Sequence, residues 1–175
     1  MSQNSTQVKE MFELWTRCTL VIIDHDDKEY TYRKKEEVKK QPKEDLGNFF
    51  LEKNEPEKEW FILTAYNPFG IDRSEEINEK ANKKLKTVLL ELNYESIYDS
   101  YGSDPEVSYK EYGFAVECLK SNNLLEKILA IGSQFSQIAI YKIEIQNNKV
   151  FNQILLTGIK NYKIKLLPYE VIQIK

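Results

Sequence analysis

The sequence has few of the residues on which most catalytic sites depend. Its one histidine, His25, is the only imidazole available as a base, so a Ser-His-Asp or Cys-His arrangement would have to use it. The two cysteines, Cys18 and Cys118, form no Cys-x-x-Cys pair and lie in apolar, strand-like runs. We therefore predict two buried free thiols in a reducing compartment, with a disulfide between them as the alternative.

Long apolar runs and cofactor motifs are also missing. No stretch approaches the roughly 18 apolar residues of a membrane-spanning helix, and residues 1–10 are polar, unlike a signal peptide. The sequence has no glycine-rich phosphate loop and no His-Glu-x-x-His zinc motif. The acidic stretch Asp24–Asp27 around His25 is typical of a turn, and a weak divalent-metal site is the alternative. We predict a cytoplasmic protein without membrane contact, metal or cofactor.

Positive charge is scarce overall. The formal net charge is −3 and the isoelectric point is about 5.4, which argues against sequence-independent nucleic-acid binding. Residues 138–175 are the exception, with six lysines and two glutamates. Such a basic segment could meet an acidic partner or RNA, or its lysines could solvate exposed strand faces.

Tyrosine, by contrast, is abundant. The chain has 11 tyrosines, and aromatic residues make up 12% of it. This abundance fits strand-rich structure, because tyrosine favours strands, and it also fits a contact surface, where tyrosine is enriched.

The hydrophobic pattern of residues 60–145 predicts the element order β-α-β-β-α-β. The expected strands cover residues 60–66, 94–101, 112–119 and 137–145, and the expected helices cover about 74–92 and 122–133. This order is typical of a ferredoxin-like α+β fold with an antiparallel sheet and with strands 60–66 and 112–119 side by side in its centre. A hairpin over 18–33 and strands after 146, including 149–156, would extend the sheet.

We divide the chain into three segments: residues 1–59 with the hairpin and a charged connection, the core 60–145, and the C-terminal extension 146–175. Short helices are expected at 11–17 and 34–43. The buried stripe of the long helix is expected at Ile77, Ala81, Leu85, Val88, Leu89 and Leu92, with Asp72 or Ser74 as its N-cap. Asn122 or Asn123 is expected to cap the second helix.

Polar side chains gather where the first core strand ends and the long helix begins. Asn78 and Asn82 continue the line of Leu85 and Leu89, so they should face inward. A helix N-terminus favours anions, which predicts a site for a small polar or anionic ligand. Alternatively, these groups cap the helix and satisfy the loop backbone. The candidate ligand-binding residues here are Thr64, Asn67, Arg73, Ser74, Asn78 and Asn82.

The same region resembles a known family. The run Trp60-Phe-Ile-Leu-Thr-Ala-Tyr-Asn-Pro68, the spaced Ser74, Asn78 and Asn82, and then Gly102-Ser-Asp-Pro105, Tyr109-Lys-Glu111, Gly113-Phe114 and Phe135-Ser-Gln137 occur in that order. Over about residues 60–143 the chain resembles the bacterial family of domains of unknown function numbered 3293. The resemblance implies a small bacterial cytosolic protein and no particular activity.

Two further candidates come from that pattern. Glu111 should lie near Asn67 and Arg73, where it could form an ion pair with Arg73 or act as a general base. Gln137 should open an edge strand at a greater distance, and we include it among the ligand-binding candidates. Glu111 is the one candidate catalytic residue.

These observations leave more than one function open. We favour a non-enzymatic interaction or regulatory protein that binds a protein partner through tyrosines or an exposed sheet edge, which could also form a homo-oligomer. The alternative is a binder of a small polar or anionic ligand at the corner around Asn67 and Arg73, or an enzyme that uses Glu111 there.

Overall fold

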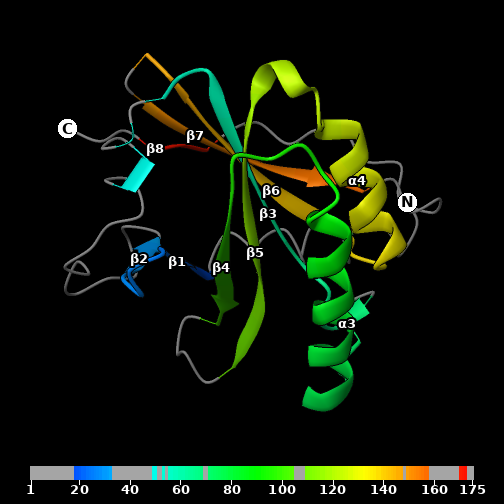
Figure 1. The fold of residues 1–175 in the computed structure, drawn as a ribbon. Helices are drawn as coiled ribbons and strands as arrows, with labels where there is room; N and C mark the ends of the chain where they lie inside the picture. Colours follow the sequence, from blue (N-terminus) through cyan, green and yellow to red (C-terminus); the bar gives the residue numbers. More distant parts are fainter. Residues whose placement is uncertain are drawn as a thin grey trace, which may run out of the picture.

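The computed structural model describes residues 18–32, 49–50, 53, 55–68, 71–104, 109–147, 149–157 and 170–172. These residues form a mixed α/β fold in which the helices α3 and α4 pack against a curled antiparallel sheet (Figure 1). The helices predicted at 11–17 and 34–43 and four of the six lysines of the basic C-terminal segment lie outside the described residues.

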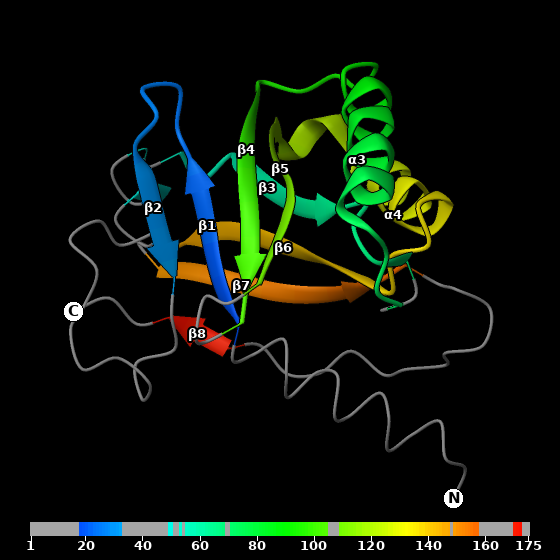
Figure 2. The same cartoon turned by 90° about the horizontal axis from the view of Figure 1, so that it is seen from below.

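The sheet has eight strands in the order β2-β1-β4-β5-β3-β6-β7-β8, and every neighbouring pair is antiparallel. The strands are β1 Thr19–Ile23, β2 Glu29–Tyr32, β3 Lys58–Thr64, β4 Ser96–Ser103, β5 Lys110–Leu119, β6 Ala139–Gln146, β7 Lys149–Leu156 and β8 Glu170–Ile172. Strands β3 and β5 are neighbours in its middle, as predicted. The hairpin β1-β2 extends the β4 side and β7-β8 extend the β6 side, also as predicted (Figure 2).

Both helices cover the same face of the sheet. Helix α3 spans Glu75–Leu89 and helix α4 spans Leu125–Gln134. Leu85 and Leu89 from α3 and Ile128 from α4 meet strand residues such as Phe61 in one buried apolar cluster. Because burial of apolar surface is the main favourable term in folding, this cluster holds α3 firmly against the strands.

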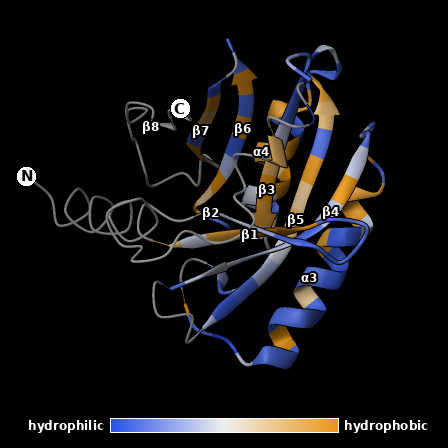
Figure 3. Cartoon of the chain, turned by 90° about the vertical axis from the view of Figure 1, so that its left-hand side faces the viewer, coloured by the Kyte–Doolittle hydropathy of each residue, from blue (hydrophilic) through white to orange (hydrophobic). Residues whose placement is uncertain are grey.

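The opposite face of the sheet carries a second buried cluster. It includes Ile22, Trp60, Tyr98 and Ile143 from the strands together with Phe50. The strands are therefore apolar on both faces, whereas α3 is mostly hydrophilic on its outer side (Figure 3). Cys118 is buried within the first cluster and Cys18 is partly buried, and the two cysteines do not form a disulfide. Burial raises the pKa of the Cys118 thiol to about 12, so it is unreactive near neutral pH.

The prediction for α3 was wrong at one position of its buried stripe. Ile77 is 55% exposed, and the buried residues are Asn78, Asn82, Leu85 and Leu89. These four follow the helical spacing of four, three and four residues, and Ile77 lies about 100° from them around the axis. The inward stripe starts with two amides rather than with Ile77 because those amides bond to the chain that leaves β3.

The predicted helix caps are confirmed only in part. Ser74 is the N-cap of α3, but its side chain makes no capping hydrogen bond, and Asp72 lies outside the helix. The N-cap of α4 is Leu124. Asn122 instead ends the short 3-10 helix Lys120–Asn122, and Asn123 follows it in the left-handed region with φ 50°. Left-handed backbone favours asparagine, which explains its presence here without a cap.

Candidate functional site

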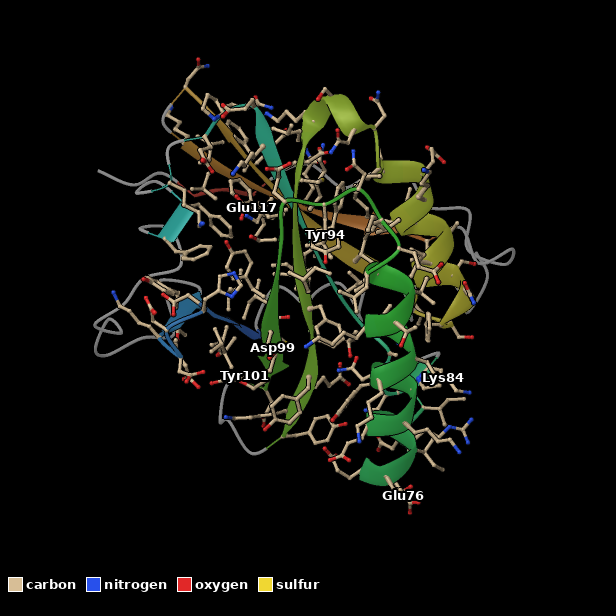
Figure 4. The ribbon with its side chains drawn as sticks, viewed as in Figure 1. Glu76, Lys84, Tyr94, Asp99, Tyr101 and Glu117 are labelled. Atoms are coloured by element: carbon tan, nitrogen blue, oxygen red, sulfur yellow. The ribbon has the colours of Figure 1, made fainter. Side chains whose placement is uncertain are left out.

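The candidate site lies at the end of the sheet where β3 ends, β5 begins and α3 starts. We call it the Asn67 corner and define it by Asn67, Arg73, Asn78, Tyr109 and Glu111. Tyr101, near the end of β4, and Glu76, in the first turn of α3, mark the same end of the molecule, whereas Glu117 lies at the opposite end of the sheet (Figure 4). The antiparallel register brings the corner together, because Thr64 of β3 pairs with Gly113 of β5.

Asn67 is the centre of the corner. Its backbone has φ 46°, and Asn67 exchanges two hydrogen bonds with the Asn78 side chain, one through its backbone and one through its own side chain. The Asn67 backbone N–H donates to Asn78 Oδ1 at 3.0 Å, and Asn78 Nδ2 donates to Asn67 Oδ1 at 3.0 Å. The backbone N–H of Arg73 also donates to Asn67 Oδ1, at 3.1 Å. One buried amide thus ties the end of β3 to the residues that start α3.

The other end of the Asn67 amide is directed toward β5. Nδ2 donates to the hydroxyl oxygen of Tyr109 at 2.7 Å and to Glu111 Oε1 at 2.9 Å. The prediction that Glu111 lies near Asn67 is therefore confirmed. The predicted Arg73–Glu111 ion pair is wrong, since the salt bridges of the described residues include none between them and Arg73 is exposed.

The environment of Glu111 differs from that of the other enclosed carboxylates. Glu59, Glu117 and Glu144 are buried, and each has a lysine ammonium within 2.8–3.8 Å. Half-buried Glu111 has no lysine or arginine partner among the described residues. Burial raises the pKa of its carboxyl, the Asn67 hydrogen bond lowers it, and the charge of Asp72 raises it, so that the net pKa lies above the usual range. A partly desolvated charge without a counter-ion lowers stability, and such residues cluster at functional sites.

Three of the four remaining predicted site residues bond to the protein backbone through their side chains, and the fourth, Ser74, makes no side-chain capping bond. Asn82 Oδ1 accepts from the Ala65 N–H at 3.2 Å, and Thr64 Oγ1 donates to the Tyr112 carbonyl at 2.5 Å. Gln137 Nε2 donates to the Tyr66 carbonyl at 2.8 Å. The side chains therefore stabilise the chain around the corner, as the alternative interpretation expected, and a ligand role for them stays a prediction.

Gln137 lies closer to the corner than predicted. The prediction placed it on an edge strand, but β6 begins at Ala139, pairs with β3 on one side and has β7 on the other. Gln137 therefore approaches the end of β3 directly. The hydroxyl of Thr157, after β7, donates in turn to the Gln137 carbonyl.

Four tyrosines at the Asn67 corner or beside it were not among the predicted site residues: Tyr66, Tyr101, Tyr109 and Tyr112. Tyr66 donates its hydroxyl to Glu75 Oε1 at 2.9 Å, and its ring lies 5.9 Å from that of Tyr112. The Tyr112 ring lies 5.9 Å from that of Tyr101. Tyr109 and Tyr112 remain 41% and 42% exposed. Two features of the sequence could have indicated these tyrosines. One is the excess of tyrosine, and the other is the Tyr109-Lys-Glu111 motif, in which we assigned a role to Glu111 but none to Tyr109.

The charges around the corner are mainly acidic. Asp72 and Glu111 face each other closely enough to affect the pKa of Glu111, and Asp72, Glu75 and Glu111 all raise the pKa of Tyr109, after burial. The exposed residues of the first helical turn add Glu76. This electrostatic environment favours a cationic group over an anionic one.

A second polar cluster lies at the opposite end of the sheet. Lys58 Nζ donates to Glu117 Oε1 at 2.8 Å, Tyr98 donates to Glu117 Oε2 at 2.7 Å, and the His25 ring stacks on Tyr98 at 4.7 Å. Burial alone would raise the pKa of Glu117, but the bonds from Lys58 and Tyr98 outweigh it and hold the pKa below the usual range. Every charge in this cluster is therefore compensated. No group of three or more metal-ligating side chains occurs within the described residues.

Residues 63–140 match the model of a family described as a protein of unknown function, DUF3293. This is the family that the sequence resembles, and the resemblance over the core is confirmed. No curated protein and no solved structure matches the chain. In the part of the chain that the structure describes, no helix is long and apolar enough to cross a membrane.

The unpaired charge of Glu111 predicts a measurable effect on stability. Replacing it with glutamine keeps an oxygen for the Asn67 amide and removes the uncompensated charge. We expect Glu111→Gln to raise the free energy of unfolding at pH 7 by about 0.5–1 kcal/mol, or roughly 2 °C in Tm. Thermal unfolding followed by circular dichroism measures this change.

The pH dependence of that effect has a definite sign. Because the folded-state pKa of Glu111 is raised, its contribution to stability is full at low pH and is lost as the pH rises through the folded pKa. The gain in Tm for Glu111→Gln should therefore be present at pH 7 and vanish at about pH 4, near the ordinary glutamate pKa. A loss of stability at pH 7 would show that the carboxylate is compensated after all.

Proposed function

We propose that the protein binds a protein partner and that the contact surface is centred on the Asn67 corner. The surface consists of Tyr109 and Tyr112, Glu111 between them in sequence, and the adjoining Ile71 and Asp72. The observation that carries the proposal is the half-buried Glu111 carboxylate, which has no lysine or arginine partner among the described residues and shares the Asn67 amide with the exposed Tyr109. Three other enclosed carboxylates have lysine partners. Glu111 is the exception, and its charge lowers the stability of the fold at this corner.

The composition of the surface supports a protein partner. Tyrosine is enriched in the well-packed centres of interfaces because it combines a large apolar ring with a polar hydroxyl. Ile71, Tyr109 and Tyr112 are 53%, 41% and 42% exposed, which leaves apolar area for a partner to cover. The Asn67 amide bonds to Tyr109 and Glu111 at once, so both side chains are already ordered before binding. Pre-ordering reduces the entropy lost on association.

The alternative functions have less support. A small polar or anionic ligand would need free amide groups, whereas those of Asn67, Asn78 and Asn82 bond to the protein, and the surrounding charges are acidic. A raised pKa is also what a general base requires, so an enzymatic role would use Glu111. We keep ligand binding and catalysis at the corner as second candidates.

We also propose a ferredoxin-like core for residues 60–145. The chain order β3-α3-β4-β5-α4-β6, the strand order β4-β5-β3-β6 and the single apolar cluster that joins both helices support this class. In such a unit the start of the third strand and the end of the first lie at the same end of the sheet. A bacterial cytoplasmic setting, which the family resemblance implies, is part of the same proposal.

Site-specific cross-linking tests the proposed surface. A photoreactive benzoylphenylalanine replaces Tyr112 in one variant and Leu90 in the control. Leu90 is 54% exposed and lies at the C-terminal end of α3, away from the corner. On irradiation of cells that produce the protein, we expect one dominant protein adduct at position 112 and not at position 90.

The captured protein is then purified and its affinity for the unmodified chain is measured. We expect Tyr112→Ala to weaken binding at least tenfold, since tyrosine anchors commonly contribute more than about 1.4 kcal/mol. Circular dichroism confirms that the variant is folded. The same adducts at both positions, no adduct at position 112, or a change of less than twofold for Tyr112→Ala would overturn the proposal.

A further inference from the structure

The hydrogen bonds of Glu111 leave one of its oxygens available. Oε1 accepts from Asn67 Nδ2 at 2.9 Å, and no bond to Oε2 is present among the described residues. The Asn67 amide is itself held by Asn78 and by the Arg73 backbone, so the carboxylate has a defined orientation. The corner therefore presents a charged acceptor whose position is set by the fold.

The charge around that acceptor favours a cation. Asp72 immediately precedes Arg73, whose backbone N–H donates to the same Asn67 amide that bonds Glu111, and the charge of Asp72 raises the pKa of Glu111. The guanidinium of Arg73 forms no ion pair with Glu111 in the described residues. The hydroxyl oxygen of Tyr109 accepts a hydrogen bond from the Asn67 amide, so the hydroxyl hydrogen can be donated to another group. A cationic group bridging Glu111 and Asp72 would relieve the repulsion between the two carboxylates.

Tyrosine rings in this cluster already bind a cation from the chain itself. Lys110 Nζ lies 4.0 Å from the centroid of the Tyr101 ring, and the Tyr101 ring in turn neighbours that of Tyr112. The exposed ring of Tyr109, whose hydroxyl shares the Asn67 amide with Glu111, can interact in the same way with a cation from outside. Arginine suits this setting better than lysine, because its planar guanidinium stacks on aromatic rings, bridges two carboxylates and is less strongly hydrated.

We propose that the protein partner inserts an arginine side chain at this surface, where Glu111 Oε2 and Asp72 bind the guanidinium and the ring of Tyr109 covers it. This inference rests on the proposed function, because it names the group that the partner presents. It makes Glu111 a specificity-determining residue. An interface in which the guanidinium is absent would leave Glu111 as a buried charge without a counter-ion.

The probe that tests this inference is the tripeptide acetyl-Gly-Arg-Gly-amide, and its control is the same peptide with citrulline. Citrulline has the shape of arginine without the charge. Titration into ¹⁵N-labelled protein should give saturable chemical-shift changes at the Asn67 and Glu111 amides with a Kd of about 1–10 mM, as a single contact allows. The citrulline peptide should cause shifts at least tenfold smaller at the same concentration.

Two variants make the result decisive. Glu111→Gln, which is expected to fold with higher stability, should weaken arginine binding at least tenfold, and Asp72→Asn should weaken it about threefold. Equal binding of both peptides, or unchanged arginine binding by Glu111→Gln, would overturn the inference. The proposed function fails separately, when position 112 captures no partner. If the captured partner binds Glu111→Gln as tightly as the unmodified chain, the proposed contact surface still stands, but the arginine inference is overturned.

Discussion

Replacement of Gly113 by alanine is expected to lower the free energy of unfolding by about 3 kcal/mol, which is the upper part of the usual range for overpacking. A Cβ on Gly113 would lie 2.4 Å from the Leu63 carbonyl oxygen and 3.1 Å from Thr64 Cβ. The nearest atom belongs to the backbone of β3, so no side chain can move aside. Strands β3 and β5 are both central and are bonded on both sides, which makes a shift costly.

A neighbouring glycine provides the control for this experiment. A Cβ on Gly102 of β4 would have Thr19 O as its nearest atom, at 4.0 Å, which is an ordinary contact. Gly102→Ala should therefore change stability by less than about 0.5 kcal/mol. Thermal unfolding of the two variants should differ by roughly 6–12 °C in Tm. Similar Tm values for both would show that β3 and β5 separate easily at Gly113, contrary to the close approach seen here.

Replacement of Asn67 by alanine is expected to cost about 3 kcal/mol and to disorder the proposed binding surface. The change removes four side-chain hydrogen bonds, to Arg73, Asn78, Tyr109 and Glu111. Each such bond contributes about 0.5–1.5 kcal/mol, less where the partner can turn to water. Alanine is also unfavourable at φ 46°, where the penalty is about 1 kcal/mol.

Two further variants separate these contributions. Asn67→Gly loses the same four hydrogen bonds but tolerates the left-handed backbone, so it should be about 1 kcal/mol more stable than Asn67→Ala. Asn123 also has positive φ, 50°, and its amide makes one local bond, to the Ser121 carbonyl. Asn123→Ala should therefore cost only about 1 kcal/mol. Urea unfolding measures all three. A cost for Asn67→Ala no larger than for Asn123→Ala would show that the amide bonds contribute little.

The predictions for the core succeeded where the hydrophobic pattern is strong. The run Trp60–Tyr66 is apolar at successive positions, as a strand buried on both faces requires, and β3 is indeed central. The spacing of Asn78 and Asn82 relative to Leu85 and Leu89 predicted that both amides face inward, and all four are buried. The helical period places all four residues on one side of the helix, because residues four and seven apart share one face.

The predictions failed where a residue's role depends on distant parts of the chain. Ile77 was placed in the buried stripe because its side chain is apolar. The sequence around it does not show that Asn78 and Asn82 receive hydrogen bonds from the backbone after β3 and are buried in its place. Arg73 and Glu111 have opposite charges, yet the amide of Asn67 bonds to the backbone of one and the carboxylate of the other. A prediction from opposite charges alone could not anticipate that the Asn67 amide bonds to both Arg73 and Glu111.

The element order, the central position of β3 and β5 and the meeting of Asn67, Asn78 and Glu111 could be read from the sequence, because they depend on hydrophobic periodicity and on the register of neighbouring strands. The three-dimensional arrangement was needed to show that Glu111 has no counter-ion among the described residues, whereas Glu59, Glu117 and Glu144 have one. The electrostatic state of a carboxylate depends on burial and on the charges around it, and the chain brings those together only when it folds.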